Sequence, residues 1–131
     1  MNITLATLHQ ATAQQVFDQV ATHLLKQNAL SATQGGCSYR GDGGLMCAAG
    51  CLISNEEMIG LIRYNTGYSW KSMISHNRVP FVHSDLITEL QKVHDCSYVD
   101  SWLEELSGVA ERRGLNQDVI TSFSSTSYIK G

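Results

Sequence analysis

Residues 35–54, GGCSYRGDGGLMCAAGCLIS, contain the residue types of this sequence that are best suited to chemistry. They hold three of the four cysteines and six of the eleven glycines, with Arg40 and Asp42 between them. Such a stretch can bind zinc through thiolates, bind phosphate through glycine amides and an arginine, or supply a nucleophilic thiol. It can also be a glycine-rich hairpin turn without a chemical role.

Zinc binding is the sharpest of these hypotheses. Cys47 and Cys51 can place two thiolates together, Cys37 can approach across a hairpin, and Cys96 or His94 can complete a tetrahedron. Structural zinc sites usually contain two close pairs of ligands. The second pair here, His94 and Cys96, does not have the spacing that is typical of such sites. Free cysteines usually pack as small apolar residues, so we expect no bound metal and keep the four cysteines as its candidates.

Phosphate binding has a weaker basis in the glycine-rich turn. Gly41, Gly43 and Gly44 can expose backbone amides, and Arg40 can add a charged donor. Asp42, however, would place a carboxylate against the anion. The stretch also lacks the G-x-x-x-x-G-K-[ST] and G-x-G-x-x-G patterns, so a plain hairpin turn is the favoured interpretation.

Nucleophilic catalysis would need a cysteine or serine within reach of a histidine. The five histidines do not select one such pair by their spacing, and neither G-x-S-x-G nor H-E-x-x-H occurs. An enzyme, zinc-stabilised or thiol-dependent and acting on a nucleotide or protein, is therefore kept as the alternative function. No cofactor is expected.

Large residues with polar ends in the irregular segments are the candidate binding residues: Tyr39, Arg40, Tyr64, Tyr68, Trp70, Arg78 and Tyr128. Four of them are predicted to bind a ligand: Tyr39, Arg40, Trp70 and Arg78. A hairpin would hold Arg40 beside Tyr39, while Trp70 and Arg78 would close over the ligand from a long loop. We expect alanine at either arginine to weaken binding without changing the melting temperature. The alternative is that Trp70 and the tyrosines only cover the core. A site divided in this way suits a subunit boundary, so a homo-oligomer is also predicted.

The charge and hydropathy of the chain exclude some partners. With a net charge of -3 and nine Lys and Arg residues scattered singly, the sequence has no basic stripe for general nucleic-acid binding. No run of eighteen apolar residues indicates a membrane span, and the N-terminus lacks the features of a secretory signal. We therefore expect a cytoplasmic protein with reduced thiols.

Apolar periodicity and capping signals predict the main helices. Residues 12–27 repeat apolar side chains at helical spacing, and Thr12 and Gln15 have the spacing of a capping box. The same signals predict helices at 84–95 and 98–113, which would form an antiparallel C-terminal hairpin. Ser54 and Glu57 mark the start of a further short helix.

The remaining segments are predicted with less regular structure. A β-hairpin is expected at 37–49, a long loop with one helical turn at 65–80, and a flexible or strand-adding tail at 116–131. Together these elements predict the α+β class, as a single mostly helical domain covering residues 1–131.

The segment CSYRGDGGLMCAAGCLIS resembles a group of short phage and prophage proteins with the pattern C-x-Y-R-G-x-x-G-L-x-C-A-x-G. VFDQVATHLLKQ before it and LITELQKVHD after it extend the resemblance over about residues 12–96. The matching residues are Cys37, Tyr39, Arg40, Gly41, Gly44, Leu45, Cys47, Ala48 and Gly50. The resemblance implies a phage origin and the host cytoplasm as its setting, and it carries no mechanism.

Small phage proteins without enzyme motifs are similar to inhibitors of host defence in their size and in their lack of recognisable motifs. By that analogy we expect an accessory binding protein that acts without catalysis. It would either sequester a nucleotide-like signal or block a host defence protein.

Overall fold

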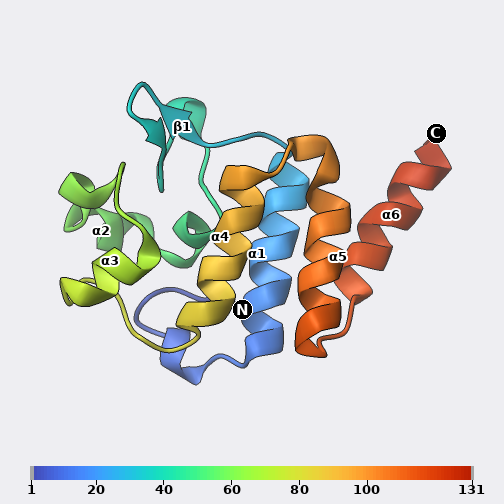
Figure 1. Cartoon of the computed structure of the whole chain (residues 1–131), viewed down its shortest axis with the longest axis horizontal. Helices are drawn as coiled ribbons and strands as arrows, with labels where there is room; N and C mark the ends of the chain where they lie inside the picture. Colours follow the sequence, from blue (N-terminus) through green and yellow to red (C-terminus); the bar gives the residue numbers. More distant parts are fainter. Residues whose placement is uncertain (1, 131) are drawn as a thin grey trace.

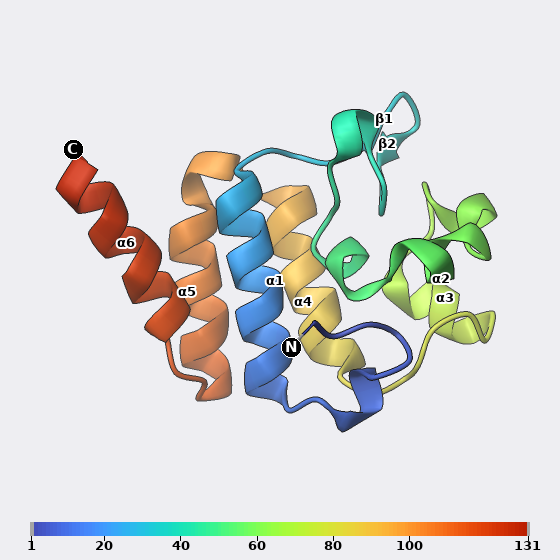
Figure 2. The ribbon, with the colours of Figure 1, turned by 180° about the vertical axis from the view of Figure 1, so that it is seen from behind.

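Three long helices lie side by side and form one side of the molecule (Figure 1). They are α1 (Ala13–Gln27), α4 (Ser84–Cys96) and α5 (Trp102–Arg113) in a computed structural model that describes residues 2–130, with side chains for residues 2–124. A fourth helix, α6 (Asp118–Lys130), packs against α1 and α5. The short elements gather on the other side of α4, as the reverse view in Figure 2 also shows.

The predicted helix at 12–27 is confirmed as α1, together with its capping box. The Gln15 amide donates to Thr12 Oγ1 at 3.1 Å, and the Thr12 amide donates to Gln15 Oε1 at 2.9 Å. Asn28 ends the helix in the left-handed conformation with φ 50°. The buried face consists of Val16, Phe17, Val20, Ala21 and Leu24.

The predicted C-terminal helical hairpin is confirmed as α4 and α5. The apolar face of α4 is buried against both α1 and α5, and its buried residues include Leu86, Ile87, Leu90 and Val93. Gly114 ends α5 with φ 66°, a conformation that suits glycine. On the surface, Glu89 of α4 accepts hydrogen bonds from both Arg112 and Arg113 of α5.

The β-hairpin lies earlier in the chain than predicted. Strand β1 (Ala32–Thr33) pairs antiparallel with β2 (Gly36–Cys37), whereas residues 37–49 contain only a single bridge between Arg40 and Met46. The second predicted strand does not form because Ala49–Leu52 folds into a buried 3-10 turn, η3. Gly50 in this turn lies so close to the Tyr39 carbonyl that a Cβ atom there would overlap it.

The C-terminal tail also differs from its prediction. It forms α6, so no strand is present through Val119–Phe123, and Gly131 lies outside the described residues. Ile120 is buried and Val119 packs against the core, and these contacts dock the helix although its other described residues are largely polar.

Two short helices complete the fold, α2 (Asn55–Ile59) and α3 (Trp70–Ser75). The capping box predicted for α2 is present, with the Glu57 amide donating to Ser54 Oγ and the Ser54 amide donating to Glu57 Oε1. Glu57 also accepts hydrogen bonds from the amides of Leu5 and Ala6, at 3.1 and 3.0 Å. Its carboxylate therefore connects the N-terminal loop to α2.

Between residues 2 and 130, no helix has the length and apolar character that crossing a membrane requires.

Replacing Glu57 with Gln is expected to lower the free energy of unfolding by about 1–3 kcal/mol, because only one acceptor oxygen remains for three amides. Although burial opposes ionisation, the amides of Ser54, Leu5 and Ala6 lower the pKa of Glu57 below its ordinary value of 4.5. The ionised carboxylate thus contributes its full stabilisation of the fold at pH values above 4.5. This stabilisation is lost as the pH falls through the lowered pKa of Glu57.

Urea unfolding at a series of pH values measures both effects. Glu56→Gln is the control, since Glu56 is exposed in the same helical turn and should change stability by less than about 0.5 kcal/mol. The Glu57 variant should also lose less of its stability than the wild type between about pH 5 and about pH 3. Equal stability of the two variants would contradict the role assigned to Glu57.

Candidate functional site

The structure brings Tyr39 and Trp70 together, but inside the core. Their ring centroids lie 6.3 Å apart, and their side chains are only 4% and 1% exposed. Tyr39 Oη donates to the Tyr68 carbonyl at 2.7 Å, and burial raises the pKa of this phenol. The Trp70 Nε1 has no hydrogen-bond partner among the described residues. These contacts correspond to the alternative interpretation, in which both rings cover the core.

Arg40 is half-buried and donates to the protein's own carbonyl groups. Its Nη1 donates to the Gly50 carbonyl at 2.8 Å, and its Nη2 donates to the Ile53 carbonyl at 2.6 Å. A longer contact of 3.3 Å joins Nη2 to Asn55 Oδ1. The guanidinium thus gives the Gly50 carbonyl of η3 a second donor beside the Ile53 amide, and it also binds the carbonyl of Ile53, the extended residue that follows η3.

A large groove lies between α1, the N-terminal loop and residues 51–56. Its volume is about 1170 Å³, and Arg40 lines it together with Asp18 and Glu56. Burial lowers the pKa of His23, also in this groove, and its Nε2 donates to the Met46 carbonyl at 2.9 Å. With one arginine against two carboxylates, the groove has no excess of positive charge to attract an anion.

Arg78, the fourth predicted residue, is exposed and belongs to a different group of side chains. Its Cζ lies 5.5 Å from the Tyr64 ring centroid, and Arg63 Cζ lies 5.7 Å from the same centroid. The Tyr68 ring meets Tyr64 edge-on at 4.9 Å, and His76 lies 5.7 Å from Tyr64. We call Arg63, Tyr64, Tyr68, His76 and Arg78 the arginine–tyrosine cluster.

Local structure fixes the two arginines of this cluster over one ring. Arg63 belongs to a 3-10 turn, η4 (Ile62–Tyr64), whose last residue turns its ring into the core. Arg78 follows α3, where Asn77 has φ 58° and the Arg78 amide donates to the Met73 carbonyl at 2.9 Å. A cation over an aromatic face is attracted by the ring's negative quadrupole.

The two arginines have no acidic partner among the side chains that the structure describes. Within residues 2–124, every ion pair with a nitrogen-to-oxygen distance up to 4.0 Å involves other residues, and neither guanidinium donates a hydrogen bond to a carboxylate. The cluster is therefore a local concentration of positive charge on a chain whose net charge is -3. The sequence analysis named Tyr64, Tyr68 and Arg78 as candidates but missed Arg63, because only the fold places Arg63 and Arg78 over the same ring.

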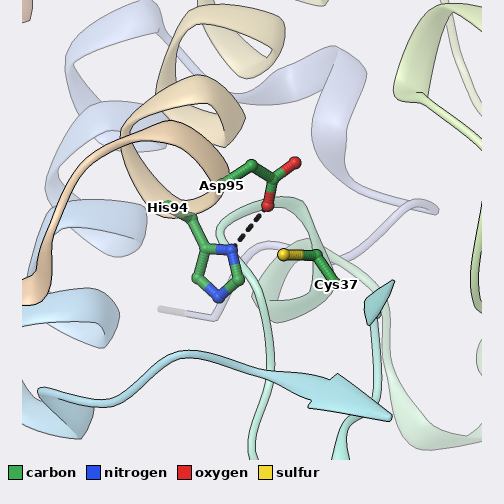
Figure 3. A group of neighbouring side chains, drawn as sticks. All are labelled: Cys37, His94 and Asp95. Carbon is green, nitrogen blue, oxygen red and sulfur yellow. Dashed lines mark hydrogen bonds and ion pairs between the residues drawn. The ribbon is translucent and has the colours of Figure 1, made fainter. Parts of the chain in front are cut away.

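Cys37, His94 and Asp95 form the second group with chemical potential (Figure 3). Their potential metal-ligating atoms all lie within 4.8 Å of one another, and no other group of three such residues occurs in the part of the chain that is described. Cys37 comes from β2, and the other two residues come from the C-terminal turn of α4. Of the four cysteines considered for zinc, the structure places only Cys37 in this group.

Hydrogen bonds already occupy both nitrogens of the fully buried His94. The Ser31 amide donates to Nε2 at 2.9 Å, which places the ring proton on Nδ1, and Nδ1 donates to Asp95 Oδ1 at 2.7 Å. A metal at Nδ1 would need a lone pair there, and the proton moved to Nε2 would then face the Ser31 N–H. The group is accordingly explained as a hydrogen-bonded connection between α4 and the segment that contains the hairpin.

The thiols of Cys37, Cys47 and Cys51 are held in their protonated form. Burial and the Asp95 charge raise the pKa of Cys37, and burial raises the pKa of Cys47 to about 12. Burial also raises the pKa of Cys51, whose Sγ donates to the Ala48 carbonyl at 3.2 Å. Because the thiolate is the nucleophile and the metal ligand, this protonation reduces both reactivities. Cys96 is exposed.

No protein-family model, curated protein or solved structure matches this chain. The phage origin implied by the sequence resemblance stays a prediction.

The variants His94→Asn and His94→Gln distinguish the hydrogen bond at Nε2, to the Ser31 amide, from the hydrogen bond at Nδ1, to Asp95. The Gln side chain can place an acceptor near the position of Nε2 for the buried Ser31 amide, whereas Asn reaches only the position of Nδ1. We expect the Asn variant to be less stable than the Gln variant by about 1–3 kcal/mol in urea unfolding. The reverse order would contradict the assigned tautomer, as would stoichiometric zinc in protein purified without added metal.

Arg40→Ala and Arg78→Ala should differ in stability, because only Arg40 satisfies internal carbonyls. We expect the Arg40 variant to lose about 1–3 kcal/mol of unfolding free energy. The Arg78 variant should change by less than about 0.5 kcal/mol. Thermal and urea unfolding measure this difference, and equal losses in the two variants would show that the Arg40 contacts contribute no stability.

Proposed function

We propose that this protein is a non-catalytic binding protein and that the arginine–tyrosine cluster is its contact surface. The observation that carries the proposal is the pair of exposed guanidinium groups, Arg63 and Arg78, at 5.7 and 5.5 Å from the Tyr64 ring centroid. Neither has a carboxylate partner among the described residues. Two cations held together in this way attract an anion more strongly than either would alone.

The state of the potential nucleophiles and bases supports binding over catalysis. The pKa values of the thiols of Cys37, Cys47 and Cys51 are raised, so these groups are protonated at neutral pH. His94 uses both ring nitrogens in hydrogen bonds, and His23 donates to a backbone carbonyl. General acid–base or nucleophilic chemistry requires such a group to face a substrate.

The resemblance to short phage proteins suggests the biological setting. An inhibitor of host defence can act by occupying its target, and it needs no turnover. All five residues of the cluster come from one chain, so the proposed contact surface does not require the homo-oligomer predicted above. Tyr39 and Arg40 contribute by holding the segment that carries Tyr64 and Tyr68.

A small zinc-stabilised or thiol-dependent enzyme is the second candidate, because Cys37, His94 and Asp95 lie together. It is the weaker one, since a metal would have to displace the His94 proton and disturb the Ser31 hydrogen bond.

Two simple anions test the proposed contact surface: tripolyphosphate and a short poly-glutamate peptide. NMR signals from the arginine Nε–Hε groups report binding at each guanidinium. We expect the Arg63 and Arg78 signals to shift together with one affinity, and the double variant Arg63→Gln/Arg78→Gln to bind at least about tenfold more weakly.

The control is Lys26→Gln/Lys92→Gln, which removes the same charge from two exposed lysines of α1 and α4. It should bind either anion as the wild type does, apart from a small general charge effect. If neither anion shifts the two arginine signals, or if both double variants weaken binding equally, the cluster is not a binding surface.

A further inference from the structure

Two exposed isoleucines adjoin the arginine–tyrosine cluster along the chain. Ile59 ends α2 and is 72% exposed, and Ile62 directly precedes Arg63 and is 68% exposed. Both are large apolar side chains that water surrounds. Isolated exposed apolar residues are common, so their arrangement relative to the cluster decides whether they have a role.

A three-residue period places these isoleucines on the outer face of the segment. Met58, Leu61 and Tyr64 are all buried, while Ile59 and Ile62 are exposed. Tight turns form residues 58–64. The Leu61 amide donates to the Met58 carbonyl at 2.9 Å, and the Tyr64 amide donates to the Leu61 carbonyl at 2.8 Å. Side chains three residues apart eclipse one another in such turns. Ile59 and Ile62 therefore lie on one outward side of the segment, and the exposed Arg63 follows Ile62 directly in the chain.

The exposure of this surface indicates the size of its partner. Arg63, His76, Arg78 and the two isoleucines are all exposed, whereas a small-molecule site encloses most of its ligand. The groove beside α1 and a hollow of about 500 Å³ that α4 and α5 line contain none of these residues. A nucleotide would lie on this surface with most of its atoms in water, while a protein could cover all of it.

We propose that the partner at this surface is a protein that presents acidic side chains next to apolar ones. This proposal rests on the proposed binding function and names its partner class. The acidic groups would pair with Arg63 and Arg78, and the apolar groups would cover Ile59 and Ile62. Arginine and tyrosine are enriched among the residues that dominate protein interfaces.

Charge complementarity also restricts where such a partner docks. The chain carries a net charge of -3, so its general field repels an acidic protein. Arg63 and Arg78, which have no carboxylate partner among the described side chains, place two positive charges at this surface. An acidic partner is consequently directed to this one surface, and electrostatic complementarity of this kind contributes to specificity and to the rate of association.

An mRNA-displayed library of random peptides tests the partner class without assuming a sequence. Peptides are selected on the wild-type protein and then assayed individually against three variants: Arg63→Gln/Arg78→Gln, Ile59→Ser/Ile62→Ser, and the control Lys26→Gln/Lys92→Gln. We expect the selected peptides to be enriched in Asp and Glu next to Leu, Ile or Phe. The first two variants should each bind them at least about tenfold more weakly than the control does.

Thermal unfolding of each variant, measured alongside, shows whether it is folded at the assay temperature. All of the substituted side chains are exposed, so the variants should unfold near the wild-type temperature. Selected peptides without acidic bias, or peptides that bind the arginine variant as well as the control, would overturn the proposed partner class.

In a second experiment, the binding of nucleoside triphosphates and cyclic dinucleotides to the same variants is measured. Tight nucleotide binding that depends on Arg63 and Arg78 but not on Ile59 and Ile62 would also overturn the acidic-protein proposal, while leaving the cluster as a binding surface. Failure of the arginine signals to respond to any anion would instead remove the proposed function itself, so the two failures are distinguishable.

Discussion

The hydrogen bonds between residues 39–40 and 65–68 hold the arginine–tyrosine cluster in place. The Arg40 amide donates to Asn65 Oδ1 at 2.7 Å, and Asn65 Nδ2 donates back to the Arg40 carbonyl at 2.9 Å. The Tyr39 amide and hydroxyl add bonds to the carbonyls of Asn65 and Tyr68. This side of the molecule has only two-residue strands, so side chains satisfy the backbone groups that a longer ladder would otherwise pair. Tyr64 keeps its position because both of its neighbouring segments are fixed.

The same principle explains the other polar groups of the interior. His94 accepts from the Ser31 amide and, with its ring 5.5 Å from that of Trp102, joins an apolar helix contact to an irregular segment. Gln27 binds both the amide and the carbonyl of Met46, and so attaches the end of α1 to the turn after the glycines. His94 and Gln27 therefore replace regular backbone pairing at these two places.

The sequence was sufficient to predict the helices but not the contacts between irregular segments. Apolar periodicity located α1, α4 and α5 to within a few residues, because a repeat over three or more turns is a strong local signal. The hairpin was displaced because Cys37 pairs with Ala32, and Ser38 and Tyr39 pair with Thr66 and Asn65. Only the single bridge between Arg40 and Met46 remains of the predicted pairing. The helix α6 was missed because its apolar residues form only a weak helical pattern and its Val, Ile and Thr residues favour a strand. Tyr64 and Arg78 were candidates from their residue types, whereas Arg63 joins them only through the fold.

Gly50 shows what kind of information the C-x-Y-R-G-x-x-G-L-x-C-A-x-G pattern carries. Its backbone touches the Tyr39 carbonyl, and Arg40 binds the Gly50 carbonyl, so three positions of the pattern depend on one another for packing. None of the five cluster residues belongs to the pattern. In any chain that shares this pattern, selection for folding would keep these three positions together, while positions outside the pattern could change without affecting this packing. The signature would then identify a shared scaffold, and differences in specificity would be found outside it.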